Sequence, residues 1–322
     1  MSDGRRNPFS PAFWRSPRPP HAFVLTRDRL VYVGPEGGAP RPARSAAPAF
    51  RALSRPLPPD TFTPGPDGSP LAGPALSGAL QRLLAEAGVK TPAASLVVPD
   101  GWVKLLVIDA AEPESHAREV DDMLRWKFGR AFGEPAPELR ISWYPAGAGA
   151  EGTRVLALAV AEPAASSWEA PFEKAGIRIG AVETAAFAVS SLGGRAGDAY
   201  LVWTDDDTAT TLVFSGSQLR FARTRPYAEA GEAVQDVRLA VAFGTPDRPA
   251  DEPPADVAAS CAAGPPDSGV LEALRAFRAA AGAPEPELLT LSRLAPGATV
   301  TPAASAQDSA VLTALGALAG GG

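Results

Sequence analysis

Cysteine is almost absent from the sequence, since Cys261 is the only one. A single cysteine excludes an intrachain disulfide and zinc or redox sites of the CxxC type, and it fits a reducing compartment. We expect Cys261 to be a small buried residue. Histidine is nearly as scarce, and we expect both His21 and His116 to be surface residues. The motifs GxxxxGK(S/T), HExxH and GxSxG are missing, which excludes a P-loop, a zincin helix and a hydrolase nucleophile elbow.

Long apolar runs and an excess of basic residues are missing as well. The longest apolar runs, such as Val155 to Ala161, are far shorter than the ~20 residues that cross a bilayer. Residues 1–20 contain arginines but no apolar centre, so they do not resemble a secretory signal. The formal net charge of −6 argues against a general nucleic-acid binder, which needs a concentrated basic face. These absences predict a cytoplasmic protein with no membrane span and no nucleic-acid partner.

Proline and glycine are plentiful, with 35 and 31 residues among 322. Such numbers imply long irregular stretches beside the globular part of the chain. Residues 1–20 mix proline and arginine with the isolated aromatics Phe9, Phe13 and Trp14, a composition that cannot build a core alone. We predict a disordered tail there. A solvated extension is favoured over the alternative, a short docking peptide anchored by the aromatics.

The order of the periodic segments predicts an α/β protein. Two β-rich runs, Phe23–Leu25 and Leu30–Val33, flank a polar turn and predict a tight hairpin. Leucines at helical spacing predict a helix from Leu76 to Ala87, and Gly88 follows where a C-terminal cap belongs. Beyond it, strands alternate with helices, which is typical of α/β folds. The other predicted elements are a loop or pair of edge strands at 35–70, strands at 95–98 and 102–108 around a Pro-Asp-Gly turn, a helix at 114–132, strands at 140–143, 155–160 and 177–182, helices at 167–175 and 184–192, a hairpin at 200–221, helices at 228–243, 270–281 and 308–319, and short strands near 257–259 and 288–291.

Three segments, taken in order, resemble PilM-like proteins, the cytoplasmic actin-like components of type IV pilus assembly machines. They read VVPDGWVKLLVIDAAEPESHAREVDDMLRWKFGRAF, FEKAGIRIGAVETAAFAVSSL and DAYLVWTDDDTATTLVFSGSQLRFARTRPY. The resemblance covers residues 95–245 well and both ends loosely. It implies an actin-like (ribonuclease H-like) fold of two lobes, the first at 21–195 with a small α/β subdomain inserted at about 100–160, and the second at 196–322. In the family, nucleotide lies between the lobes.

The turns that would hold the phosphates of a nucleotide lack the glycines that close backbone approach requires. The first hairpin has TRDR in place of an Asp-x-Gly loop, and WTDDDTATT in the second contains no glycine. Trp203 occupies the place of the usual Asp there. Near the end, CAAGPPDSG keeps only Gly264, and Pro265 removes a backbone donor. The loops are therefore degenerate, and we expect no cofactor.

Some acidic residues keep the question of a ligand open. Asp205, Asp206 and Asp207 could bind Mg²⁺, although the pattern favours a solvated turn, and we expect no metal. Glu183 resembles the acidic start of the connecting helix in actin-like ATPases, but a glutamate at a helix start also interacts favourably with the helix dipole. If ATP and Mg²⁺ do bind, the resemblance implies that Glu183, Thr208, Thr210 and Gly264 contact them.

The helix predicted at 114–132 carries the most informative surface feature. Its apolar stripe leaves Trp126 on the opposite side, among Arg118 and Arg125, where a large aromatic has no evident role in the core. It packs under a neighbouring loop or it contacts a partner, and these two readings are about equally favoured. The resemblance implies that the cytoplasmic N-terminal peptide of a PilN-like inner-membrane protein binds near this subdomain. We therefore predict Trp126, Arg125 and Arg118 as partner-binding residues, with an altered peptide preference because Lys127 replaces a commonly acidic position.

The resemblance and the degenerate loops together predict an adaptor without ATP hydrolysis, a pseudo-ATPase. Such a protein would be recruited to the inner face of the inner membrane, hold a PilN-like protein and contact the motor ATPases of the pilus. Two alternatives stay open: an active actin-like ATPase with diverged loops, and a GspL-like component of a type II secretion system. A GspL-like chain should carry its own transmembrane helix, which the sequence lacks.

Overall fold

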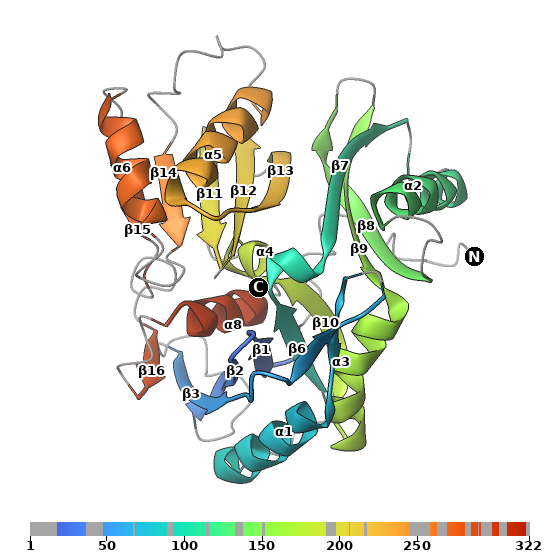
Figure 1. Cartoon of the computed structure of the whole chain (residues 1–322), viewed down its shortest axis with the longest axis vertical. Helices are drawn as coiled ribbons and strands as arrows, with labels where there is room; N and C mark the ends of the chain where they lie inside the picture. The colour runs from blue at the N-terminus through green and yellow to red at the C-terminus, as the bar shows by residue number, and fades with distance from the viewer. Residues whose placement is uncertain are drawn as a thin grey trace, which may run out of the picture.

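The computed structural model divides the chain between two mixed sheets, each covered by helices (Figure 1). Most of the predicted N-terminal tail, as well as Asp206 and Gly264, lies outside the described residues. The structure describes residues 18–36, 48–66, 68–88, 93–111, 113, 116–132, 138–149, 152–190, 198–205, 207–215, 218–244, 258–262, 269–280, 285–288, 290, 298–302 and 308–319.

The first sheet has six strands in the order β10-β6-β1-β2-β3-β16. The predicted N-terminal hairpin is confirmed, because β1 and β2 pair antiparallel with Ala22 opposite Val33. Strands β6 and β10 join it in parallel. Strand β10 therefore forms one edge of this sheet. The strands are β1 (Ala22–Leu25), β2 (Arg29–Pro35), β3 (Ala49–Pro56), β6 (Ala93–Val98), β10 (Arg178–Thr184) and β16 (Thr299–Thr301).

Alternating side chains give the first sheet two buried faces. Phe23 and Leu25 pack with helices α1 and α3, whereas Ala22 and Val24 pack with α4 and α8 on the other face. Helix α1 ends as predicted, because Gly88 adopts φ 63° and its N–H bonds the Leu84 carbonyl. These helices are α1 (Pro74–Ala87), α3 (Glu162–Lys174), α4 (Ala185–Ser190) and α8 (Ser309–Ala319).

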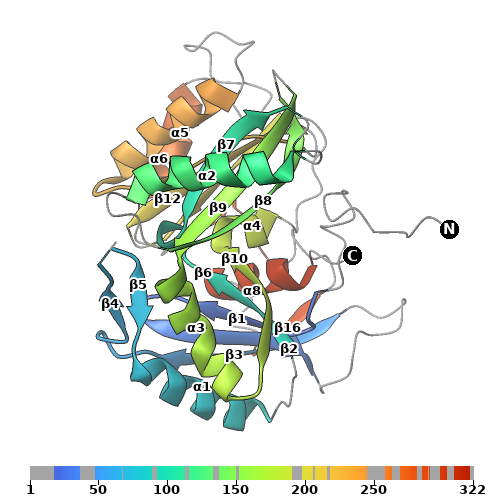
Figure 2. The same cartoon turned by 90° about the vertical axis from the view of Figure 1, so that its right-hand side faces the viewer.

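A three-stranded antiparallel sheet, β7-β9-β8, is inserted between β6 and α3. Helix α2 covers its outer face and buries Val120, Leu124 and Phe128 there (Figure 2). The two strands predicted around a Pro-Asp-Gly turn are confirmed as β6 and β7, and residues 100–102 form a 3-10 turn between them. The two strands belong to different sheets. The elements are β7 (Lys104–Ala110), α2 (Ala117–Phe132), β8 (Leu139–Ala148) and β9 (Thr153–Ala161), and a separate small hairpin comprises β4 (Phe62–Pro64) and β5 (Pro70–Ala72).

The second sheet has five strands in the order β13-β12-β11-β14-β15. Helices α5 and α6 pack on it through an apolar cluster that includes Val237 and Leu274. The predicted hairpin at 200–221 is extended to three antiparallel strands. The elements are β11 (Asp198–Thr204), β12 (Thr208–Ser215), β13 (Gln218–Pro226), α5 (Ala230–Gly244), β14 (Ala258–Ala262), α6 (Val270–Ala280) and β15 (Glu287–Leu288).

The C-terminal segment returns to the first sheet, whereas the sequence places all of residues 196–322 in the second lobe. Strand β16 pairs in parallel with β3, and α8 packs on β1, β2 and β6. Helix α8 also crosses α4 so closely that a Cβ on Gly316 would lie 2.1 Å from the Ala188 carbonyl oxygen. The chain thus enters the second sheet and comes back, which ties the two halves together.

The two histidines lie in different surroundings. His116 is exposed, as predicted. The prediction for His21 is wrong, because its side chain is buried beside Tyr32, with 2.8 Å between Nδ1 and the phenolic oxygen. Burial lowers the pKa of His21. Its position just before β1, a central strand, accounts for the difference.

Candidate functional site

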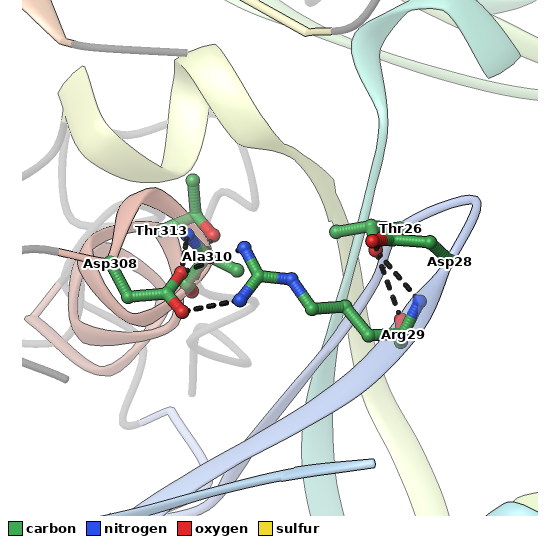
Figure 3. Close-up of polar contacts among 6 residues, drawn as sticks. All are labelled: Thr26, Asp28, Arg29, Asp308, Ala310 and Thr313. Atoms are coloured by element: carbon green, nitrogen blue, oxygen red, sulfur yellow. Dashed lines mark hydrogen bonds and ion pairs between the residues drawn. The ribbon is translucent and has the colours of Figure 1, made fainter. Parts of the chain in front are cut away.

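The turn between β1 and β2 is closed by its own residues. The Thr26 hydroxyl accepts a hydrogen bond from the Arg29 backbone N–H at 3.1 Å. The Arg29 side chain then reaches away from the hairpin to Asp308 at the start of α8, where Nη2 donates to Oδ1 at 3.0 Å (Figure 3). Asp308 also caps α8, since its Oδ1 accepts from the Ala310 N–H at 2.9 Å. The first predicted phosphate turn is therefore attached to the C-terminal helix.

The turn between β11 and β12 meets this first turn across the lobes. Arg27 donates from Nη2 to Asp207 Oδ2 at 2.6 Å, and this ion pair joins residues 180 positions apart. The buried indole of Trp203 donates to Asp205 Oδ1 at 3.0 Å. Both carboxylates of the turn that the structure describes are thus engaged by protein groups.

A buried carboxyl group, Asp100, lies where the first lobe, the second lobe and α4 meet. Both of its oxygens accept from the Ala186 N–H at 3.2 Å, and its own N–H donates to Asp205 Oδ2 at 3.3 Å. Burial, and next the charge of Asp205, raise the pKa of Asp100 to about 7. Sequence reasoning missed this residue, although the Pro-Asp turn was its signal. Asp100 carries a carboxyl group that ionises reluctantly at the junction of three elements.

The structure describes three of the four residues predicted to contact a nucleotide. Glu183, at the end of β10, makes an ion pair with Arg18. Thr210 is buried, and its hydroxyl lies 2.9 Å from that of Thr224. Thr208 lies against residue 101, where an added Cβ would come within 2.9 Å of its Cγ2. Gly264 lies outside the described residues, and among those described no three His, Cys, Asp or Glu side chains are placed to hold a metal ion.

A cavity of about 70 Å³ opens beside β10, and we call it the β10 cavity. Its walls come from the ends of β6 and β10, from α3, and from β8 and β9 of the inserted sheet. Val182 is 37% exposed there, although it belongs to a strand of the main sheet. Arg140 is held by Glu169 at 2.7 Å and by Glu162, which limits the free charge in the wall. The residues that characterise the cavity are the apolar Val98, Val103, Leu158, Trp168 and Val182, with the charged Arg140 and Glu183.

The predicted partner residues on α2 lie on another surface. Trp126 is 61% exposed, and the Arg130 guanidinium lies 5.3 Å from its ring centroid. Arg118 is exposed, and Arg125 donates to the Leu139 carbonyl at 3.4 Å. None of these residues lines the β10 cavity. Within the described chain, the α2 residues and the β10 cavity are therefore two separate surface regions.

Comparisons with known proteins bear on the fold. No protein-family model matches the sequence, and no curated protein matches it either. A solved structure of a PilM-PilN type IV pilus biogenesis complex aligns with a TM-score of 0.65 at 16% identity, covering 96% of this chain and 99% of that one. An actin-like ATPase fold of unknown function from Bacteroides thetaiotaomicron gives 0.49 at 10% identity, covering 94% and 98%. The cytoplasmic domain of EpsL, an inner membrane component of the type II secretion system of Vibrio cholerae, gives 0.43 at 9% identity, covering 92% and 93%.

The fold predicted from the sequence is confirmed by the first of these alignments. It extends over almost the whole of both chains, so the second sheet and the C-terminal return are included. Among the described residues, no helix is long and apolar enough to span a bilayer. The protein has the actin-like α/β fold and resembles, from end to end, the structure of the PilM-PilN type IV pilus complex.

Proposed function

We propose that this protein is an adaptor of a type IV pilus or related secretion platform, which binds the cytoplasmic peptide of a PilN-like membrane protein and does not hydrolyse ATP. It would work in the cytoplasm at the inner face of the inner membrane, linking the platform to motor ATPases. The similarity to a PilM-PilN complex supports the partner. One observation carries the absence of hydrolysis: the Arg27–Asp207 ion pair joins the two turns that would otherwise hold phosphates.

The chemistry of the junction between the lobes and of the β10 cavity supports the same proposal, in which the protein binds a peptide and not a nucleotide. Phosphate groups need backbone N–H donors and cations that face the ligand. At the junction of the lobes, the arginines Arg27 and Arg29 are already bound to Asp207 and Asp308. The β10 cavity instead presents apolar wall beside an edge strand, a combination that suits an extended peptide with an apolar side chain.

Calorimetry on the purified full chain tests this proposal. We expect saturable binding of a synthetic peptide that covers the cytoplasmic N-terminal segment of a PilN-like protein from the same gene neighbourhood, at micromolar affinity, which corresponds to about −8 kcal/mol. We expect no saturable heat with Mg-ATP. Saturable binding of Mg-ATP that Glu183→Ala abolishes would instead support the active ATPase.

Trp126→Ala tests the second contact region in the same titration. If Trp126 anchors part of the partner, its truncation should weaken peptide binding by more than about 1 kcal/mol. Glu119→Gln, an exposed position on the same helix outside the predicted contact residues, serves as a control for general changes of charge. Unchanged affinity in Trp126→Ala would remove this residue from the binding site and leave the β10 cavity as the peptide site.

A further inference from the structure

The charges of helix α2 are unevenly distributed along its length. All of its acidic residues lie in its first half, and the last of them is Asp122. From there to Phe132, every charged residue of the helix is a cation. An exposed lysine at the start of β7 adds a positive charge at the same end, since its Nζ lies 5.9 Å from the Phe132 ring centroid. The four cations, which we call the basic end of α2, are Arg125, Lys127, Arg130 and Lys104.

Trp126 lies among these cations. Its side chain is 61% exposed, and the Arg130 guanidinium lies 5.3 Å from its ring centroid. Cations near the C-terminus of a helix interact favourably with the helix dipole, which is sufficient reason for their presence. The dipole does not explain an exposed indole. An indole flanked by cations is typical of surfaces that meet a boundary between water and an apolar phase.

Acidic groups near the basic end do not cancel its charge. Glu162 and Glu169 are both bound to Arg140 in β8. Glu138 is exposed beside Leu139, whose carbonyl accepts from Arg125, so it offsets one of the four cations. This end of the inserted subdomain is therefore positive, although the whole chain has a formal net charge of −6.

We propose that the basic end of α2 and Trp126 contact the surface of an anionic lipid bilayer. Helix α2 lies on the outside of the inserted sheet (Figure 2), and none of these residues lines the β10 cavity. The outer face of a single helix is a ridge, which fits a flat lipid surface better than it encloses a peptide. Each cation near an anionic bilayer raises binding about fivefold, and tryptophan favours the headgroup level.

The lipid contact goes beyond the proposed function, which requires only a peptide for recruitment. Because the rest of the chain is acidic, attraction to anionic lipid is confined to the basic end of α2 and orients the protein on the bilayer. The contact is weak by itself. A membrane protein bound at a second site would add to it, since the bilayer is then held at a high effective concentration.

Sedimentation of the full chain with lipid vesicles tests the contact. The probes are vesicles of phosphatidylcholine alone and vesicles in which about a third of the lipid is phosphatidylglycerol. At low salt we expect at least about fivefold more protein on the anionic vesicles, and high salt should remove this excess. Equal binding to both kinds of vesicle, or binding to neither, would overturn the proposal.

A pair of charge variants locates the contact. Arg125→Gln with Arg130→Gln should lower binding to the anionic vesicles at least about tenfold. The matched control is Arg82→Gln with Lys174→Gln, which removes the same charge from exposed positions on α1 and α3 and should bind as the unchanged protein does. Circular dichroism verifies that both proteins are folded. An equal loss in the two double variants would show attraction by overall charge alone and overturn the role of α2.

Trp126→Ala tests the aromatic part of the contact. We expect it to lower binding to the anionic vesicles at least about threefold, with Trp126→Phe in between. Phe243→Ala is the control, because it removes an aromatic side chain that is 66% exposed on α5. If Trp126→Ala weakened the PilN-like peptide in solution and left vesicle binding unchanged, α2 would belong to a protein interface and the lipid contact would be overturned.

The two proposals fail in different ways. Vesicle binding without any binding of the PilN-like peptide in calorimetry would overturn the proposed partner and leave the lipid contact intact. Peptide binding by a protein that ignores anionic vesicles would overturn the lipid contact and leave the adaptor intact.

Discussion

The junction between the lobes differs from the β10 cavity in how its side chains are paired and buried. At the junction, Arg27 binds Asp207 across the lobes and Asp100 is buried against the Ala186 N–H. At the cavity, Val182 in the edge strand β10 stays 37% exposed. The protein pairs the polar groups of the junction with its own residues, whereas at the cavity it leaves an apolar side chain partly exposed. Changes at the junction should therefore alter stability, and changes at the cavity should alter binding.

Gly316→Ala should produce the largest effect, because the new methyl group would collide with the backbone of α4. Its Cβ would lie 2.1 Å from the Ala188 carbonyl oxygen, so one of the two helices must shift. We expect a loss of at least about 2 kcal/mol in the free energy of unfolding. Gly78→Ala is the matched control, since its Cβ would meet only a flexible arginine at 3.8 Å and alanine favours the helix.

Urea unfolding of both glycine variants measures this difference. Peptide affinity of the folded Gly316→Ala protein should change little, since residue 316 does not line the β10 cavity. Equal stability of the two variants would contradict the close crossing of α4 and α8 that ties the chain's end to the first lobe.

Val182→Asp should weaken peptide binding strongly and stability only slightly, which is the reverse of the effect expected for Gly316→Ala. A carboxylate in a mostly apolar wall would have to lose its water when a peptide docks, so we expect at least a tenfold loss of affinity, or about 1.4 kcal/mol. Stability should change by less, because the native side chain is already partly in solvent. Calorimetry and urea unfolding on the same preparation provide both values. A normal affinity would place the peptide elsewhere, with α2 as the next region to test.

The junction should make stability depend on pH. Burial and the charge of Asp205 raise the pKa of Asp100 to about 7, above its value in the unfolded chain. The folded protein then binds more protons than the unfolded one between about pH 4 and 7, so this group's contribution to stability falls as pH rises through that window. We expect a loss of more than about 1 kcal/mol between pH 5 and pH 8.

Asp100→Asn should remove that part of the pH dependence. The amide oxygen can still accept from the Ala186 N–H, but the side chain no longer ionises. Urea unfolding at several pH values compares this variant with Asp122→Asn, an exposed control on α2. An unchanged slope in Asp100→Asn would contradict a protonated carboxyl at the junction.

Arg27→Gln should produce the smallest change in stability. Its ion pair with Asp207 is about half exposed on both sides, and such pairs contribute at most about 1 kcal/mol. A double-mutant cycle with Asp207→Asn isolates the coupling, which should weaken in high salt. No coupling at low salt would mean that the two turns are not held together by this pair.

Local patterns predicted much of the fold. The β1–β2 hairpin, α1 with its left-handed Gly88 and the alternation of strands and helices follow from short-range chemistry that a single sequence displays. The return of the C-terminal segment does not. Strand β16 has only three residues, and its pairing with β3 is decided by tertiary contacts. The burial of helix α8 could have been predicted from the sequence. The helix is apolar nearly all round, and such helices are buried between layers.

The candidate sites were less accessible to sequence reasoning. The missing glycines of the two turns were visible, but the Arg27–Asp207 pair joins residues far apart in the sequence. The burial of Asp100 depends on three elements that meet only in the fold. The predicted position of Trp126 outside the core is confirmed by its exposure. It could be predicted because it follows from helical periodicity alone. The β10 cavity is bounded by four strands and a helix, and no local pattern encodes it.

Amide hydrogen exchange of the full chain, alone, with the PilN-like peptide and with Mg-ATP, tests the central contrast most directly. Our account predicts that the peptide slows exchange in β10, β8 and α3 around the cavity. It predicts no slowing by Mg-ATP in the two turns at residues 26–29 and 204–208. Protection of both turns by Mg-ATP, together with no effect of the peptide on β10, would contradict it.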